Sequence, residues 1–173
     1  MSDSIEITRA TREEGSILLA LIDALADFEK LQKPVGEARA RLLEHGFGER
    51  PRFETWLARV EGKAVGYALA FETYSSFLAL PTFYLEDLFV LPEYRKRKVG
   101  LALFTHLVGE AQRRGCGRME WAVLDWNTGA LRFYERLGAR WLNDWKVYRL
   151  TRDDIAAIAG GFQRESSDAR GRH

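Results

Sequence analysis

Cysteine is nearly absent from this chain, since Cys116 is the only one and lies in the turn-like run Arg-Arg-Gly-Cys-Gly-Arg. A single cysteine excludes an internal disulfide framework and leaves no second thiol for a metal or redox pair. The three histidines, His45, His106 and His173, lie far apart without the spacing of metal ligands. We therefore expect a protein without a metal site.

Long apolar runs and an excess of one charge are also missing. No stretch approaches the roughly 18 apolar residues that a membrane span requires, and the first residues contain neither a basic nor an apolar leader region. We therefore expect a cytoplasmic protein without membrane contact. The 26 basic and 25 acidic side chains leave a net charge of +1, so the protein as a whole is no electrostatic partner for nucleic acid. Any site for a polyanion must be local.

What is present suffices for one domain with a full core, because 46% of the 173 residues are hydrophobic. We expect a single domain over residues 1–159. From Gly160 the composition turns to Gly, Ser, Arg and Asp, which predicts a disordered tail over residues 160–173.

The spacing of apolar residues predicts both strands and helices. The expected strands are residues 5–7, 53–60, 64–74, 84–91, 118–124, 140–142 and 146–150. The expected helices are residues 11–31, 37–45, 100–114 and 130–137, with a further short helix after Thr151. Gly46, Gly115 and Gly138 are the expected ends of the second, third and fourth helices.

The stretch from Tyr84 to Gly100 reads as a strand that ends at Pro92, a basic loop and the start of a helix. The first N–H groups of a helix have no acceptor within the helix and point outward at its positive end, where a pyrophosphate can bind them. The basic loop, residues 95–98, adds positive charge, and Gly100 permits close approach because it has no Cβ. A solvated surface turn is the alternative interpretation of such a loop.

Glu86 and Asp87 are adjacent acids within this apolar and aromatic strand. Carboxylates are costly to bury without partners, which favours a functional role. Because successive side chains of a strand face opposite sides, we expect one of the two to point toward a site and the other elsewhere.

The order of strand, basic loop, helix and strand is followed by the motif Asn127-x-x-Ala-x-x-Phe-Tyr-x-x-x-Gly, and this arrangement resembles the GCN5-related N-acetyltransferases (GNAT). Four further motifs are His45-Gly-Phe-Gly-Glu-Arg-Pro, Tyr84-Leu-Glu-Asp, Pro92-Glu-Tyr-Arg and Ala122-Val-Leu-Asp-Trp-Asn, and they resemble the diamine and thialysine acetyltransferase branch of that family. The resemblance covers about residues 5–150. It implies an α/β (α+β) GNAT fold: a mixed, mostly antiparallel sheet of six to seven strands with about four helices. It also implies a homodimer and a sheet that splits between its fourth and fifth strands to admit the pantetheine arm of acetyl-CoA.

The resemblance further implies the site residues. The implied contacts to acetyl-CoA are Leu88, Val90, Arg95, Lys96, Arg97, Lys98, Val99, Gly100, Leu101, Asn127 and Tyr134. Tyr134 matches the general acid that protonates the departing CoA thiolate, and Glu86 would bind the amine or help to deprotonate it. Asp87 and Glu29 would complete the substrate site. The chain departs from the family pattern at Lys98, where a glycine is usual, so either the turn is not left-handed there or some affinity for acetyl-CoA is lost.

The predicted function is transfer of acetyl from acetyl-CoA to a primary amine of a small molecule by direct attack. That reaction needs a neutral amine, a polarised carbonyl and a proton for the leaving sulfur, which a phenol with a pKa near 10 can supply. The amine is a diamine, a polyamine or a thialysine-like amino acid; the loop 75–81 lacks the Asp and Trp frequent in the diamine branch, which favours the amino acid. The alternatives are acetylation of a protein, a peptide or a drug-like amine, and a CoA-binding module without turnover.

Overall fold

The structure, a computed structural model, describes residues 4–168. The chain divides into two compact units, Met1–Val123 and Leu124–His173. The strands, all in the first unit, are β1 (Ile5–Arg9), β2 (Glu54–Val60), β3 (Lys63–Ser75), β4 (Leu80–Val90) and β5 (Arg118–Glu120). The helices of the first unit are α1 (Gly15–Glu29), α2 (Glu37–Phe47) and α3 (Val99–Arg113); those of the second are α4 (Thr128–Arg136) and α5 (Arg152–Asp168). Short 3-10 helices cover Arg12–Glu14 and Pro92–Tyr94.

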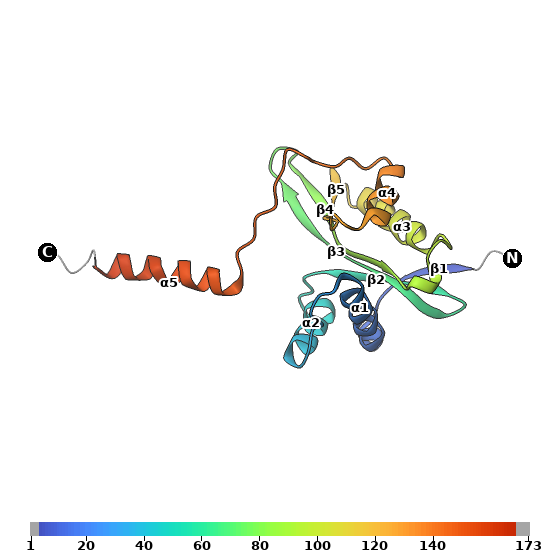
Figure 1. Cartoon of the computed structure of the whole chain (residues 1–173), viewed down its shortest axis with the longest axis horizontal. Helices are drawn as coiled ribbons and strands as arrows, with labels where there is room; N and C mark the ends of the chain where they lie inside the picture. Colours follow the sequence, from blue (N-terminus) through green and yellow to red (C-terminus); the bar gives the residue numbers. More distant parts are fainter. Residues whose placement is uncertain (1–3, 169–173) are drawn as a thin grey trace. The chain divides into compact units, whose positions relative to one another are not determined.

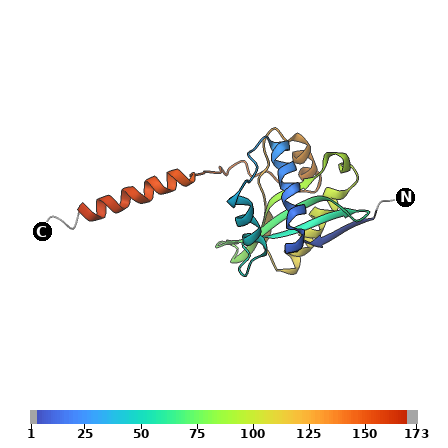
Figure 2. The same ribbon diagram turned by 90° about the horizontal axis from the view of Figure 1, so that it is seen from below.

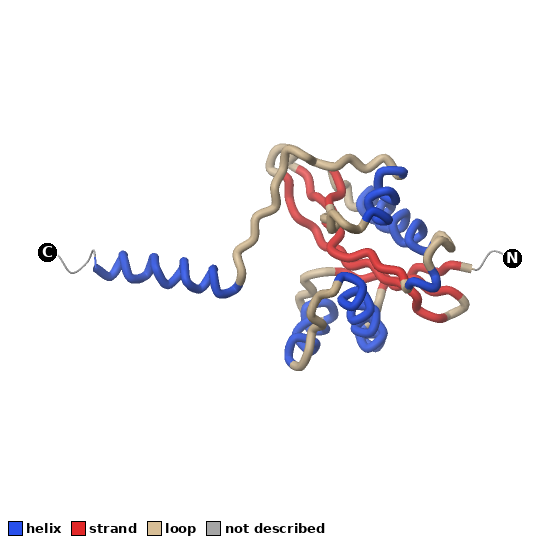
Figure 3. Tube along the Cα trace, viewed as in Figure 1, coloured by secondary structure: helices blue, strands red, loops and turns tan. Residues whose placement is uncertain are grey.

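One five-stranded sheet in the order β1-β2-β3-β4-β5 organises the first unit. Neighbouring strands are antiparallel from β1 to β4, whereas β5 runs parallel to β4. Helices α1 and α2 lie on one face of the sheet and α3 lies on the other (Figures 1 and 3). The predicted mixed α/β fold with a mostly antiparallel sheet is confirmed.

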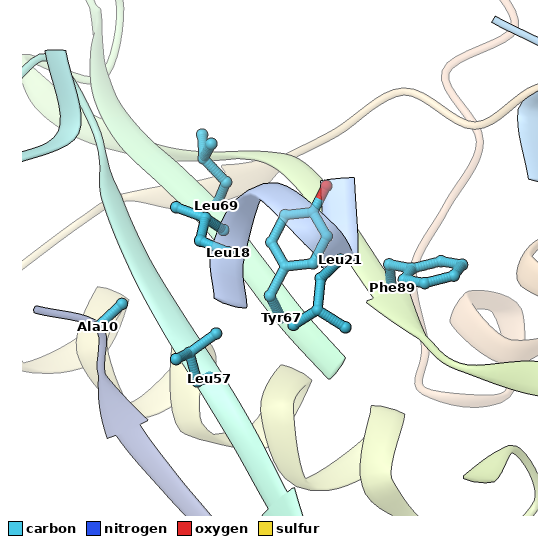
Figure 4. Close-up of a cluster of buried hydrophobic side chains, with 7 residues drawn as sticks. All are labelled: Ala10, Leu18, Leu21, Leu57, Tyr67, Leu69 and Phe89. Atoms are coloured by element: carbon cyan, nitrogen blue, oxygen red, sulfur yellow. The ribbon is translucent and has the colours of Figure 1, made fainter. Parts of the chain in front are cut away.

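A hydrophobic core, here called the α1-side core, lies between α1 and the sheet, and Figure 2 shows α1 lying across the strands. Seven buried side chains form a cluster there (Figure 4): Ala10, Leu18, Leu21, Leu57, Tyr67, Leu69 and Phe89. Leu18, Leu57 and Tyr67 are fully buried, and each buried side chain of this size stabilises the fold by roughly 2 kcal/mol. This cluster fixes α1 over β3 and β4, the two strands whose residues form the candidate site.

The sheet has fewer strands than the six or seven expected. β5 spans three residues instead of 118–124, and segments 140–142 and 146–150 are not strands. Alternating apolar residues form a strand only where a neighbouring strand pairs with them and a core covers one face. Trp141, Val147 and Tyr148 are each more than 80% exposed, so no core covers these segments.

One helix end also differs from expectation. α2 continues past Gly46 to Phe47, and Gly48 follows its end with an N–H that donates to the Glu44 carbonyl at 2.8 Å. Gly46 instead lies against a ring, since a Cβ there would come within 2.8 Å of Cε2 of Phe53. The predicted ends at Gly115 and Gly138 are confirmed, because α3 and α4 stop just before them and both glycines have positive φ.

The predicted disordered tail overlaps a helix. α5 continues through Gly160 to Asp168, and its start is capped as the sequence indicates, with the Thr151 N–H donating to Oδ2 of Asp154 at 2.8 Å. Residues 169–173 of the predicted tail lie outside the described residues. Within the described range, no helix is both long and apolar enough to cross a membrane.

Candidate active site

The carboxyl-terminal half of β4 has one edge that β5 does not cover. β5 pairs only with Thr82–Tyr84, while β4 continues to Val90. The N–H of Leu91 donates to the Val65 carbonyl at 2.9 Å, on the β3 side. Alternate residues of a strand direct their backbone groups to opposite edges, so Leu88 and Val90 direct theirs toward the open edge. The sheet therefore splits between β4 and β5 at the residues predicted to contact the pantetheine arm.

The N-terminus of α3 presents free backbone donors beside this split. The first helical bond runs from the Ala102 N–H to the Lys98 carbonyl at 2.9 Å, so the N–H groups of residues 99–101 precede it and have no acceptor in the helix. No described side chain caps this end. A Cβ added at Gly100 would meet only Cγ2 of Val90, at 3.8 Å. Packing therefore does not require a glycine here, and the space fits the approach of a pyrophosphate.

Lys98 adopts the left-handed conformation that a glycine would favour, with φ of 65°. Lys96 does so as well, with φ of 62°. A residue with a Cβ pays roughly 1–2 kcal/mol for this conformation. The loop thus keeps a left-handed turn despite the departure from the family pattern, and it carries two exposed ammonium groups next to the free donors of α3.

The Arg95 side chain turns toward the protein. Its Nε donates to the Val90 carbonyl at 3.0 Å, and its guanidinium carbon lies 4.4 Å from the centre of the Phe28 ring. Partial burial lowers the pKa of this guanidinium. Arg95 therefore ties the loop to β4 and α1, and a contact from its side chain to pyrophosphate stays a prediction.

Glu86 and Asp87 lie on the same face of β4, so the expectation that they face opposite sides was wrong. The pairing with β3 shifts between Leu69 and Ala70, which leaves Glu86 as the extra residue of a β-bulge. Oδ2 of Asp87 accepts a hydrogen bond of 3.0 Å from the Tyr67 hydroxyl, within the α1 side of the sheet. Glu86 lines a pocket with Leu69 on that same side.

The three predicted substrate residues, Glu86 and Asp87 of β4 and Glu29 of α1, interact electrostatically. Burial raises the pKa of Asp87 to about 6; the Tyr67 hydrogen bond opposes the rise, and the charges of Glu86 and Glu29 add to it. Burial also raises the pKa of Glu29, the last residue of α1. The carboxyl end of a helix favours a cation, so this corner suits an ammonium group. Sequence reasoning missed Tyr67, which has no motif and joins the site only through strand register.

An open pocket of about 420 Å³ adjoins these carboxylates. It is lined by Arg52, Phe53, Leu69, Phe71 and Glu86. The walls are apolar, and the pocket carries one side chain of each charge. Sequence reasoning also missed Arg52 and Phe53, although both directly follow the His45-Gly-Phe-Gly-Glu-Arg-Pro motif.

Within the second unit, helix α4 carries Tyr134, the predicted general acid. Oδ1 of Asn127 caps the helix by accepting from the Ala130 N–H at 3.2 Å. Tyr134 is buried, with 9% of its surface exposed, and its ring lies 5.1 Å from that of Phe133. Burial raises the pKa of the Tyr134 phenol, which therefore stays protonated at neutral pH, as a general acid must.

Comparison with known proteins places these features in a family. A model of the acetyltransferase (GNAT) family matches residues 18–139, more than half of the chain. The chain belongs to the GNAT acetyltransferase family. It is therefore an acetyl-CoA-dependent N-acetyltransferase.

Curated relatives of this GNAT acetyltransferase include two kinds of amine acetyltransferase. A thialysine N-epsilon-acetyltransferase of Sus scrofa is 33% identical over 168 residues, which covers 91% of this chain and 98% of the relative. An L-ornithine N5-acetyltransferase of Arabidopsis thaliana is 44% identical over 93 residues, which covers 54% of this chain and 41% of the plant protein. The match thus spans less than half of the plant relative.

Solved structures show the same fold. An integron cassette protein from the mobile metagenome of V. cholerae has a TM-score of 0.77 at 25% identity and covers 92% of this GNAT chain and 98% of its own. An aminoglycoside N-acetyltransferase in complex with CoA has a TM-score of 0.72 at 20% identity and covers 88% and 97%. The latter likeness concerns the fold alone.

Proposed function

We propose that this acetyltransferase transfers acetyl to the primary amine of a small molecule, either a diamine or polyamine or an amino acid with a side-chain amine. The observation that carries the proposal is the group of carboxylates Glu29, Glu86 and Asp87 next to the split edge of β4. Asp87 directly precedes Leu88, whose backbone faces the open edge. An ammonium group held by these acids would therefore lie close to the arm of acetyl-CoA.

The relatives support the same class of substrate. The names of two of them specify thialysine and L-ornithine, both small molecules with a primary amine at the end of a chain. The group of carboxylates in the structure supports the same substrate class, because negative charges attract a cationic amine more strongly than a neutral acceptor.

Glu86 has the first task in the reaction. The amine arrives as an ammonium ion, because the pKa of an alkylamine lies near 10, and it must lose a proton before it can act as a nucleophile. Glu86 is exposed and is in a position to accept that proton directly or through a water molecule. Asp87 and Glu29 hold the cation beside it until the proton leaves.

Tyr134 has the second task. Acetyl-CoA, when bound, supplies the thioester whose acetyl group the amine takes. As the new C–N bond forms and the C–S bond breaks, Tyr134 would donate its phenolic proton to the sulfur. The second proton of the amine would leave to solvent, and the Tyr134 phenolate would regain a proton from solvent. The free N–H groups of Val99, Gly100 and Leu101 would hold the pyrophosphate, with Lys96 and Lys98 adding charge. Asn127 would provide a further contact.

We further propose that the enzyme is a cytoplasmic homodimer that binds neither nucleic acid nor membranes. The net charge of +1 supports the absence of nucleic-acid binding, because such binding requires a broad basic surface. Sedimentation of the purified enzyme tests the dimer, and band-shift assays at low salt test nucleic-acid binding.

The function is tested by measuring CoA release from acetyl-CoA with putrescine, spermidine, lysine, thialysine and a lysine-containing peptide. We expect Tyr134→Phe to lower kcat by about 100-fold or more while the affinity for CoA stays unchanged, because general acid catalysis contributes about that much. The matched control is Tyr148→Phe, since the Tyr148 ring is 89% exposed, and it should retain full activity. Full activity of Tyr134→Phe would contradict the assigned role.

In the panel of amines, preference for the peptide would favour protein acetylation, and CoA binding without turnover of any amine would favour a binding module.

A further inference from the structure

Arg52 and Glu86 line the same pocket but do not pair with each other. Within the described part of the chain, no carboxylate forms an ion pair with the Arg52 guanidinium. Other arginines near α2 are engaged: Arg39 Nη1 lies 2.9 Å from a carboxylate oxygen of Asp23. Arg52 thus presents an unpaired guanidinium to a pocket that already holds a carboxylate.

We propose that Arg52 determines specificity by binding the α-carboxylate of an amino-acid substrate whose side-chain amine lies at Glu86. This inference rests on the proposed function and names its substrate class. The enzyme then selects amino acids with a terminal amine over diamines and polyamines of the same length.

The backbone fixes the position from which Arg52 acts. Its N–H donates to the His45 carbonyl at 2.7 Å, which joins the segment before β2 to the last turn of α2. The next residue, Phe53, packs its ring against Gly46 and against the α1-side core. The root of the Arg52 side chain is therefore anchored on both sides, while its guanidinium remains exposed to a ligand.

The chemistry of the pocket matches a zwitterion. A guanidinium binds a carboxylate through two parallel hydrogen bonds, a geometry that an ammonium group cannot reproduce. The rings of Phe53 and Phe71 and the side chain of Leu69 suit the methylene chain between the two charged ends. A diamine would instead place its second ammonium near Arg52, and the repulsion of like charges would disfavour it.

The experiment compares two pairs of amines that differ only by the α-carboxylate: ornithine with putrescine, and lysine with cadaverine. We expect the wild type to show the higher kcat/KM for the amino acid of each pair. Arg52→Gln should lower kcat/KM for the amino acids by about tenfold, mainly through KM, as expected for loss of one solvent-exposed charged contact. Its kcat/KM for the diamines should stay unchanged or rise. Arg52→Lys should recover part of the loss, because it restores the charge without the fork.

Arg50→Gln is the matched control, since Arg50 is exposed two residues away and does not line the pocket. For each pair, this variant should leave the ratio of kcat/KM for the amino acid to kcat/KM for the diamine at the wild-type value. If Arg52→Gln and the wild type had equal ratios of kcat/KM for amino acid to kcat/KM for diamine, the role of Arg52 would be overturned. The proposed function would remain intact. If the wild type acetylated none of these four amines and neither thialysine nor spermidine, both the proposed function and this inference would fail. Unchanged turnover of putrescine by Arg52→Gln would show that the variant is folded.

Discussion

At the scale of single residues, Lys98 keeps a backbone conformation that costs free energy. Its φ of 65° lies in the left-handed region, where a Cβ is unfavourable. We expect Lys98→Gly to raise the free energy of unfolding by about 0.5–1 kcal/mol. This is the net effect of two changes: glycine relieves the strain of the left-handed backbone, but it also adds conformational entropy to the unfolded chain, which offsets part of the gain. Urea denaturation measures the change. Arg97→Gly is the control, because Arg97 does not have positive φ, and it should lower stability instead. Equal effects of the two changes would contradict the assignment of strain to Lys98.

Asp87 links the site to stability through its raised pKa. The folded value is about 6, whereas an unfolded aspartate titrates near 3.9. Between these values the native state binds more protons than the unfolded state, so the free energy of unfolding falls as pH rises from about 4 to 6. The loss amounts to at most about 3 kcal/mol and persists above pH 6.

We expect Asp87→Asn to remove this dependence, because a neutral amide can still accept the Tyr67 hydrogen bond without carrying a charge. Urea denaturation of both proteins at several pH values from 4.5 to 7.5 tests the point. The variant should gain stability relative to the wild type as pH rises from 4.5 to about 6, and the difference should stay constant above that. Parallel stability curves for the two proteins would show that Asp87 has an ordinary pKa.

At the scale of elements, the start of α3 combines a structural and a binding role. We expect Gly100→Ala to fold normally, since its Cβ would lie 3.8 Å from Cγ2 of Val90, yet to weaken CoA binding by about tenfold or more by obstructing the pyrophosphate. Gly109→Ala on the same helix is the control, because its Cβ would enter open space. It should gain up to about 1 kcal/mol of stability at unchanged affinity. Calorimetric titration with CoA and urea denaturation distinguish the two effects, and equal affinity in both variants would argue against binding at Gly100.

The elements also show which parts of the site the sequence could predict. The strand, loop and helix around residues 84–114 were predictable, because Pro92, the basic run and the helical spacing are local signals. The side-chain directions of Glu86 and Asp87 were not, because the bulge depends on how β4 pairs with β3. The contacts of Tyr67 and Arg52 were missed for the same reason: they arise between segments far apart in the chain.

At the scale of the whole molecule, alternating apolar residues after α4 predicted strands that the structure does not contain. Residues 140–150 have the composition of strands, but strand formation depends on a partner and a covered face, which sequence spacing alone does not reveal. The helix α5 is the converse case. It has the local signal of a capped start at Thr151 and forms without burying any side chain over residues 151–161.

This exposure predicts that α5 contributes little to the stability of the fold. We expect removal of residues 152–173 to change the free energy of unfolding by no more than about 0.5 kcal/mol, the usual range for changes at exposed positions. Leu18→Ala in the α1-side core is the reference and should cost about 3 kcal/mol, because Leu18 is fully buried. Urea denaturation at two protein concentrations measures both. If the shortened chain lost more than 1 kcal/mol, and only at the higher concentration, α5 would be buried against a second subunit, because stability gained from association depends on protein concentration.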